Sequence, residues 1–234
     1  MTAILALDGV SAGYGPFKAL FDVSLTVEPG HAVGLLGSNG VGKTTVARVA
    51  TGLVAPTAGT VTVDGEDLTR ASAWRFARAG VAHAPEGRSV FATLTVEENL
   101  RLSFRRSQGR KGVAAALDAA FVRFPALGKR RRQPAGTLSG GEQRMLSLAR
   151  VLVEAPKLLV ADELSLGLAP IIVDEIYNEL ARLRTEGTSL LIVEQQVTHA
   201  LDLCDRVVLL DHGSVAWEGS SAEAGDRVVS SLLG

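Results

Sequence analysis

One stretch of eight residues, 37–44, constrains this chain more than any other. It reads GSNGVGKT and matches the phosphate-binding pattern G-x-x-x-x-G-K-[ST]. The apolar run AVGLL precedes it and the helix-prone run TTVARVATGL follows, which is the strand-to-helix context that the pattern requires. A glycine-rich turn that carries Lys and Thr by chance is the alternative, and both flanks count against it. We therefore expect the chain to bind the phosphates of a nucleotide.

The chemistry of this loop follows from its residue types. Its glycines let consecutive backbone N–H groups face inward at the start of a helix, where the helix dipole favours an anion. Lys43 supplies a mobile cation for the β and γ phosphates, and Thr44 offers a hydroxyl to Mg²⁺, which prefers oxygen ligands. The residues expected to bind the nucleotide here are Gly37, Ser38, Asn39, Gly40, Val41, Gly42, Lys43, Thr44 and Thr45.

Short apolar runs alternate with helix-length segments through much of the chain. HAVGLLG, KLLVAD, SLLIVE and RVVLLD are apolar at consecutive positions, and residues 170–184 repeat apolar side chains every three or four positions. Strands that are apolar on both faces and alternate with helices predict an α/β fold with a mostly parallel sheet covered on two sides.

Two regions depart from this alternation. The runs ILALDGVSAGYG, ALFDVSLTVEPG and GTVTVDGEDL alternate apolar and polar residues around turn dipeptides, which predicts antiparallel hairpins. From about residue 71 to 132 the pattern is helical and more polar, and Thr95 and Glu98 have the spacing of a capping box. This part is expected to be an inserted helical subdomain.

A second strand supplies the carboxylates that a phosphate-binding loop needs. KLLVADE ends in Asp162, expected to hold Mg²⁺ through water, and in Glu163, expected to polarise the attacking water. A surface carboxylate at a strand end is the alternative for Glu163. More than a hundred residues separate Lys43 from Asp162, which is more than small nucleotide kinases usually have.

The segment between them contains LSGGEQ, residues 138–143, directly before a helical run. Ser139 is a good helix N-cap, and two glycines leave N–H groups uncovered, so the segment forms a second anion cradle. Alone it would be an ordinary cap; beside a phosphate-binding loop it is highly specific.

With Tyr14, the phosphate-binding loop, LSGGEQ and LLVADE in this order, the chain resembles the ATPase subunits of ABC transporters over essentially its whole length. The resemblance implies an ATPase with a P-loop NTPase (RecA-like) core, an N-terminal antiparallel β subdomain and an inserted helical subdomain. It implies one ABC ATPase domain, 1–234, with the core at 1–86 and 151–234 and the helical and signature part at about 87–150.

In that family the signature segment of one subunit closes over the γ-phosphate held by another, so ATP is sandwiched in a dimer. The resemblance therefore adds Ser139, Gly140, Gly141 and Glu142 to the nucleotide contacts, and it stacks Tyr14 on adenine. An aromatic side chain packed within a hairpin is the alternative for Tyr14.

Two residues differ from the wider family. Glu86, in VAHAPEGRSVF, stands where the family carries a glutamine that touches Mg²⁺, and Gln195 stands where it carries a histidine that reaches the γ-phosphate. His199 is expected inside the following helix and not as a substitute. With SLGLAP and TVEENL, both replacements resemble the ATPases of branched-chain amino acid uptake. We expect Gln195 to donate its amide N–H to the γ-phosphate or the attacking water. Leu164 replaces a further family residue, the proline after the catalytic carboxylate.

The resemblance implies partners that the chain itself does not contain: a second ATPase subunit of the same or a sister chain, two membrane permease subunits and, indirectly, a solute-binding protein. The permease is expected to contact the Glu86 loop and the helices up to about residue 127. A net charge of −1 gives no reason to expect nucleic acid. The N-terminus lacks a secretory signal, and no apolar run reaches the ~20 residues of a membrane span, which predicts a cytoplasmic protein, peripheral on the inner face of the membrane.

Several alternatives remain open from the sequence. The solute can be urea, an amide or another amino acid, because this chain never touches it. A non-transport ABC ATPase would be expected to carry a coiled-coil insertion or a second cassette, and a small-metabolite kinase would lack LSGGEQ. The basic run at 129–132 is read as a solvated face, with anion or lipid contact as the alternative. The single cysteine, Cys204, is read as a buried apolar residue and not as a reactive thiol.

Overall fold

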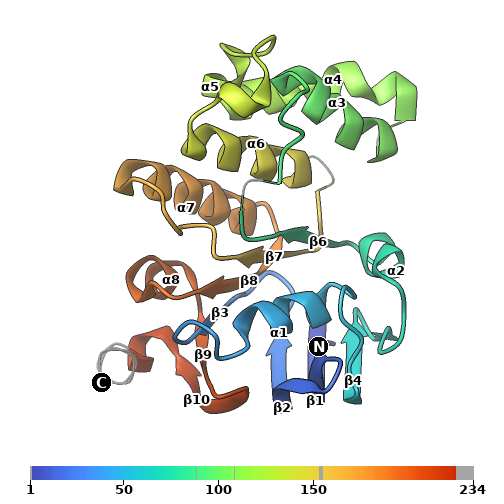
Figure 1. Cartoon of the computed structure of the whole chain (residues 1–234), viewed down its shortest axis with the longest axis vertical. Helices are drawn as coiled ribbons and strands as arrows, with labels where there is room; N and C mark the ends of the chain where they lie inside the picture. Colours follow the sequence, from blue (N-terminus) through green and yellow to red (C-terminus); the bar gives the residue numbers. More distant parts are fainter. Residues whose placement is uncertain (1, 88, 108, 153–154, 225–234) are drawn as a thin grey trace.

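Two β-sheets form the framework of the molecule (Figure 1). The computed structural model describes residues 2–87, 89–107, 109–152 and 155–224. The larger sheet has the strand order β10-β9-β3-β8-β7-β6 and the smaller one β2-β1-β4-β5. The strands are β1 (Leu5–Tyr14), β2 (Phe17–Val27), β3 (Ala32–Leu36), β4 (Ala58–Val63), β5 (Glu66–Asp67), β6 (Val81–Ala84), β7 (Leu158–Asp162), β8 (Ser189–Glu194), β9 (Arg206–Asp211) and β10 (Ser214–Ser220).

The predicted α/β fold with a mostly parallel sheet is confirmed. Strands β9, β3, β8, β7 and β6 pair in parallel, and only β10 at one edge is antiparallel to its neighbour. The smaller sheet is antiparallel, as the alternating N-terminal runs predict. Its β4–β5 turn places Asp64 and Gly65 at φ +51° and +80°, the left-handed backbone that a two-residue hairpin turn requires.

Helices cover both faces of the larger sheet. In Figure 1, α1 lies between the two sheets, and α7, α6 and the α3–α5 group follow one another on the other side. The helices are α1 (Lys43–Ala50), α2 (Ala73–Arg78), α3 (Val96–Ser107), α4 (Gly109–Arg123), α5 (Pro125–Gly128), α6 (Gly140–Leu152), α7 (Pro170–Thr185) and α8 (Val197–Leu203), with a 3-10 turn at Ala135–Thr137.

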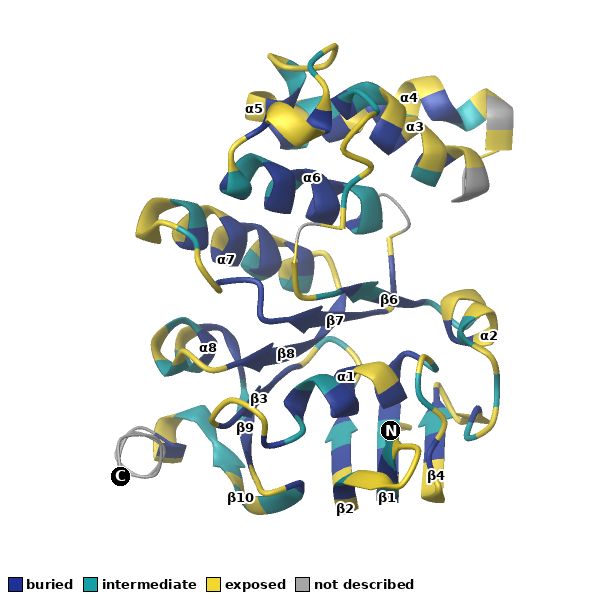
Figure 2. Ribbon diagram, viewed as in Figure 1, coloured by how far each residue is buried: buried dark blue, intermediate teal, exposed yellow. Residues whose placement is uncertain are grey.

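Strand β7 shows why the strand sequences are apolar at every position. Leu158 and Val160 belong to the hydrophobic cluster shared with α1 and the antiparallel sheet, whereas Leu159 and Ala161 belong to the cluster shared with α3–α7. Successive side chains of a strand point to opposite faces, so a sheet covered on both sides needs both sets apolar. Figure 2 shows these central strands as buried almost throughout.

The α3–α6 segment contains the predicted capping box. The Thr95 hydroxyl accepts the Glu98 N–H at 3.2 Å, and the Glu98 carboxylate accepts the Thr95 N–H at 2.8 Å. This reciprocal pair starts α3. Because α6 packs in the same hydrophobic cluster as one face of β6–β8, no gap in packing marks a boundary among the described residues. The division at residues 86 and 151 stays a prediction.

Cys204 is buried, and burial raises the pKa of its thiol to about 12, which favours the interpretation as a packing residue. Within the described ranges, no helix is both long and apolar enough to span a bilayer.

Candidate nucleotide-binding site

Four neighbouring parallel strands end at the candidate site. Strand β3 leads into the phosphate-binding loop (residues 37–44), β8 leads to Gln195, β7 to Asp162 and Glu163, and β6 to Glu86. These strands are neighbours in the order β3-β8-β7-β6. Because parallel strands end at the same edge of a sheet, residues up to about 160 positions apart in sequence converge there.

The phosphate-binding loop has the backbone that an anion cradle needs. Gly40 and Gly42 have φ of +82° and +110°, and a Cβ on Gly42 would lie 2.8 Å from the carbonyl oxygen of Ala19. Helix α1 begins at Lys43 with no acidic residue in its first turn and, among the described residues, no side-chain hydrogen bond to its start. Ser38, Asn39 and Gly40 are exposed, whereas Gly37, Val41 and Thr45 are buried. The N–H groups of the loop are therefore available to phosphates.

Lys43 lies inside the loop and not on its surface. The residue is 3% exposed, and its Nζ donates to the Ser38 carbonyl at 3.0 Å and lies 3.2 Å from Oε1 of Glu163. The ammonium thus contacts both the loop that would surround the phosphates and the carboxylate expected to polarise water. Phosphates entering the loop would compete with Glu163 for this cation.

Asp162 and Thr44 offer oxygen atoms beside this loop. The Thr44 hydroxyl lies 3.4 Å from Oδ1 of Asp162, which is 1% exposed. Burial raises the pKa of Asp162 to about 6, and the nearby charges of Glu163 and Glu86 add to this effect. The described residues contain no cluster of three metal-ligating side chains. An oxygen-only set with few protein ligands fits Mg²⁺, which usually keeps several waters and binds substrate phosphates.

Glu163 has an unusual backbone. Its φ is +46°, a left-handed conformation that costs a non-glycine residue about 1–3 kcal/mol. Its N–H donates to the Val193 carbonyl at 2.8 Å, and its own carbonyl accepts a hydrogen bond from the Arg144 guanidinium. Both main-chain groups of Glu163 are therefore held, one by β8 and one by α6.

Glu194, the last residue of β8, and Gln195, which follows it, lie in different environments. Glu194 is buried and accepts hydrogen bonds from the Ser165 N–H at 3.0 Å and the Ser165 hydroxyl at 2.7 Å. Burial raises the pKa of Glu194, although the hydrogen bonds from Ser165 act to lower it. Gln195 is exposed at the site edge. His199 lies in α8, as expected, with Nε2 3.0 Å from Oδ1 of Asp174.

The signature loop (residues 138–143) starts α6 with a second capping box. The Ser139 hydroxyl accepts the Glu142 N–H at 3.3 Å, and the Glu142 carboxylate accepts the Ser139 N–H at 2.9 Å and its hydroxyl at 3.0 Å. Burial would raise the pKa of Glu142, but the hydrogen bonds from Ser139 and Arg130 outweigh it, so the pKa is lowered. Gly141 packs on α7, where a Cβ would lie 2.8 Å from Cγ2 of Ile172. Helix α6 packs on one face of the larger sheet and α1 on the other, and no contact among the described residues joins Ser139, Gly140, Gly141 or Glu142 to the phosphate-binding loop of the same chain (Figure 1).

Tyr14 lies at the end of β1, and the residue is 43% exposed. Its hydroxyl accepts a hydrogen bond from Nη1 of Arg48 at 3.0 Å, and the guanidinium lies 5.8 Å from the ring centroid. Tyr14 is therefore held by Arg48 of α1 and is exposed to solvent beside Phe17, its partner in the β1–β2 hairpin.

Sequence reasoning missed Arg144, Ser165 and Glu194. Arg144 directly follows the signature loop, and an arginine among apolar residues of a helix is a signal for a buried partner. Glu194 is the last residue of a strand that is apolar on both faces, so it was bound to point into one of two buried layers. Arg88, part of the PEGR segment, lies outside the described residues.

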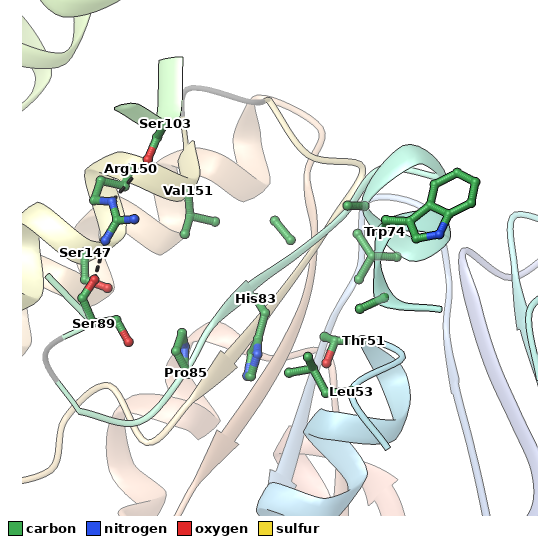
Figure 3. Close-up of a pocket in the computed structure, with 14 residues that line it drawn as sticks. Thr51, Leu53, Trp74, His83, Pro85, Ser89, Ser103, Ser147, Arg150 and Val151 are labelled. Carbon is green, nitrogen blue, oxygen red and sulfur yellow. Dashed lines mark hydrogen bonds between the residues drawn. The ribbon is translucent and has the colours of Figure 1, made fainter. Parts of the chain in front are cut away.

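A cavity of about 540 Å³ lies beside the site, between α2, β6, α3 and α6 (Figure 3). Trp74 stands on one side, 53% exposed, and on the other side Arg150 donates to the Ser103 hydroxyl at 3.1 Å and to the Ser89 carbonyl. His83 lies between them. Its Nε2 is buried without a hydrogen-bond partner among the described residues, and burial, with Arg48, lowers its pKa to about 4.

Comparison with curated proteins finds close relatives among transporter subunits. The chain is 41% identical over 219 residues to the high-affinity branched-chain amino acid transport ATP-binding protein BraG of Pseudomonas aeruginosa, covering 94% of each chain. It is 35% identical to the probable branched-chain amino acid transport ATP-binding protein LivF of Archaeoglobus fulgidus, covering 92% of this chain and 91% of that one. It is also 35% identical to the lipopolysaccharide export ATP-binding protein LptB of Haemophilus influenzae, covering 93% and 91%.

Solved structures give the same result for the fold. The ADP conformation of MJ1267, an ATP-binding cassette of an ABC transporter, superposes with a TM-score of 0.85 at 26% identity and covers all of both chains. The family model described as ABC transporter matches residues 20–165, more than half of the chain. With the converging strand ends and the two glycine-rich helix starts, these matches establish that the chain belongs to the ABC transporter family, as an ATP-binding subunit that hydrolyses ATP.

Proposed function

We propose that the chain binds ATP in the phosphate-binding loop and hydrolyses it with Glu163 polarising the attacking water. Lys43 and the loop N–H groups neutralise the phosphates, Thr44, Asp162 and Glu86 hold Mg²⁺, and Tyr14 stacks on the adenine. Mg²⁺ held by these residues would supply charge neutralisation for the bound phosphates. The observation that carries this proposal is the contact of buried Lys43 with Glu163 at one edge of the sheet, beside Asp162.

Gln195 is assigned the role of positioning donor. It is exposed at the end of β8, beside the strand that carries Glu163, so its amide can reach a bound phosphate or water without desolvation of a buried group. We expect Gln195→Ala to lower turnover about 10²-fold with little change in ATP affinity, since removal of a transition-state donor has this effect. Gln196→Ala, one residue on and also exposed, is the matched control. Unchanged turnover of Gln195→Ala would remove this role.

The active form is a dimer in which the signature loop of a second subunit, with Ser139, Gly140, Gly141 and Glu142, closes on the γ-phosphate. The placement of α6 and α1 on opposite faces of the larger sheet supports this arrangement, because the signature loop then needs the phosphate-binding loop of another subunit. The test is gel filtration of the Glu163→Gln variant, which is expected to dimerise with ATP and not with ADP. A monomer in ATP, alone and with a sister subunit, would contradict the sandwich.

The cavity in Figure 3 is the proposed docking site for a short helix of a membrane subunit. It opens between the core sheet and the inserted helices, next to the Glu86 loop, so an occupant would contact both parts of the chain. Its lining joins the apolar Leu53 and Trp74 with hydrogen-bonding groups of His83 and Arg150. Closure of the dimer would then move the membrane subunit.

The transporter is proposed to import branched-chain amino acids. Relatives with this printed function at 41% and 35% identity support it, as do Glu86 and Gln195, and the export relative at 35% marks the main alternative. The complex would contain two permease subunits, a second ATPase of the same or a sister chain, and an external solute-binding protein, with this chain at the inner face of the membrane. Urea, amides and other amino acids are the alternative solutes.

The decisive experiment measures uptake of labelled leucine, isoleucine and valine in a strain lacking this gene. Uptake is expected to fall and to return with the wild-type gene but not with Glu163→Gln. Labelled urea, short amides and glutamate form the comparison arms. Normal uptake of all three branched-chain amino acids in the deletion strain would reject this solute class while leaving the ATPase assignment intact.

A further inference from the structure

Arg144 is buried beside the site but has no part in the nucleotide binding or catalysis proposed for it. It lies in the second turn of α6 and is 4% exposed, and all the hydrogen bonds of its guanidinium within the described part of the chain go to main-chain carbonyls. Nη1 donates to Pro85 at 2.8 Å and to Gly87, Nε donates to Leu164 at 3.2 Å, and Nη2 donates to Glu163. One side chain thus joins α6 to the segments that follow β6 and β7.

These two segments carry the carboxylates of the site. Pro85 and Gly87 flank Glu86, and the other two acceptors are Glu163 itself and the residue after it. Burial lowers the pKa of Arg144, whereas the charges of Glu194, Glu86, Asp162 and Glu163 raise it. An arginine stays protonated under such conditions. The guanidinium is therefore a fixed cation among four acids, and it contacts the main chain of Glu163, whereas Lys43 contacts its carboxylate.

The hydrogen bond to the Glu163 carbonyl acts on a strained residue. Glu163 has φ of +46°, and among the described residues the hydrogen bonds of its own main-chain groups are the N–H bond to Val193 and the carbonyl bond from Arg144. Strained backbone at a catalytic position persists where its surroundings hold it. Loss of the guanidinium would let this peptide relax and would reorient the Glu163 carboxylate relative to a bound nucleotide.

We propose that Arg144 is a positioning residue that transmits movement of the signature loop to Glu163 and to the Glu86 loop. Ser139 caps α6 and Arg144 lies five residues later on the same helix, so a shift of the helix start on a partner's γ-phosphate moves the guanidinium and its four carbonyl acceptors together. This inference rests on the proposed dimer. It adds that the position of Glu163 in each subunit depends on whether the signature loop of that same subunit has bound the γ-phosphate held by its partner.

Two variants separate this role from a merely structural one. Arg144→Gln removes the charge, and Arg144→Lys keeps it but cannot span four carbonyls with one planar fork. We expect kcat to fall about 10²-fold for Gln and about 10-fold for Lys, with the ATP Kd within about 3-fold of wild type. Arg184→Gln is the matched control, because Arg184 is part-buried, donates to the Leu203 carbonyl at 2.7 Å and bonds Asp205 away from the site.

The specific readout is hydrogen exchange in the Glu163→Gln background, in which ATP stays bound. In that background ATP is expected to protect residues 139–142, 85–87 and 163–166. Adding Arg144→Gln should abolish protection of the last two segments and leave that of 139–142. Retained protection of all three, or a kcat within about 2-fold of wild type in Arg144→Lys, would overturn the proposal. If Arg144→Gln does not fold, Arg144→Lys decides by the same two measurements. If ATP protects none of these segments in Glu163→Gln alone, the dimer proposal fails instead.

Discussion

The chain has two glycine-rich helix starts, and they differ in what fills them. The start of α1 has no acidic residue in its first turn and no side-chain cap among the described residues, and its cation, Lys43, is internal. The start of α6 is capped by Ser139 and occupied by the Glu142 carboxylate, which accepts the Ser139 N–H and hydroxyl. One cradle is open to an external anion, and the other contains an anion of its own.

This difference assigns the two cradles different tasks. The start of α1 can bind a triphosphate without giving up an internal bond other than the Lys43–Glu163 contact. At α6 a phosphate must compete with a carboxylate that already interacts with the helix dipole and the Ser139 N–H. Affinity for nucleotide should therefore reside at α1, whereas α6 should respond to the γ-phosphate only when a second subunit presents it.

The largest effect is expected from the open cradle. Lys43→Ala removes the only cation that contacts both the loop carbonyl of Ser38 and Glu163 among the described contacts, and it should weaken ATP binding and lower turnover by about 10²-fold or more. Fluorescent-nucleotide titration and phosphate release measure the two effects. Lys157→Ala, which breaks an exposed ion pair with Asp64, is the control and should change neither. If Lys43→Ala still bound ATP tightly, Lys43 would not be the source of the affinity for ATP.

The second effect is a pH dependence at the open cradle. The pKa of Asp162 is raised from 3.8 to about 6, so its contribution to stability is complete below pH ~4 and is lost as the pH rises through 6. Above that pH the buried charge costs up to about 3 kcal/mol. With EDTA present, Asp162→Asn should therefore melt above wild type at pH 7.5, and the difference should shrink towards pH 4. Thermal melts at several pH values measure it, and a constant difference in Tm would contradict it.

A smaller effect is expected from the cap of the second cradle. Ser139→Ala removes the hydroxyl that accepts the Glu142 N–H and should destabilise the chain by about 1 kcal/mol. It also removes a donor to the γ-phosphate of the partner, so turnover should fall about 10-fold while the monomer keeps its ATP affinity. Thr95→Ala at the equivalent cap of α3 should reproduce the loss of stability without the loss of turnover. If Ser139→Ala and Thr95→Ala lost turnover equally, the loss would come from the weakened cap and not from a lost contact of Ser139 with the γ-phosphate.

The smallest effect tests the competition directly. Glu142→Gln keeps a capping box, because Gln serves at this position, but it removes the negative charge. The ATP concentration for half-maximal dimerisation should fall about 3-fold, with unchanged ATP binding by the monomer. Glu98→Gln, in the capping box of α3, is the matched control and should have no such effect. A higher ATP requirement in Glu142→Gln would show that the carboxylate assists closure and does not oppose it.

Much of the site was accessible from sequence because its parts are local patterns joined by one topological rule. Lys43 and Asp162 each end or follow an apolar run, and parallel strands bring such ends to one edge. The capping box at Thr95 was predicted, but the same spacing at Ser139 and Glu142 was read only as a cap, so the internal carboxylate was missed. The contacts of Arg144 could not be predicted from the sequence. Every residue has a main-chain carbonyl, so no residue type marks the acceptors, and the contact with Pro85 spans about 60 positions.

The single buried thiol of Cys204 gives these experiments a practical handle. A side chain that burial keeps protonated, in a chain with one cysteine, will react slowly with maleimide dyes. A cysteine introduced at an exposed position outside the expected nucleotide contacts, such as Thr137, could then be labelled without first replacing the native one. Energy transfer between dyes on two separately labelled copies would follow their approach and separation during each catalytic cycle, in real time and in an otherwise unaltered molecule.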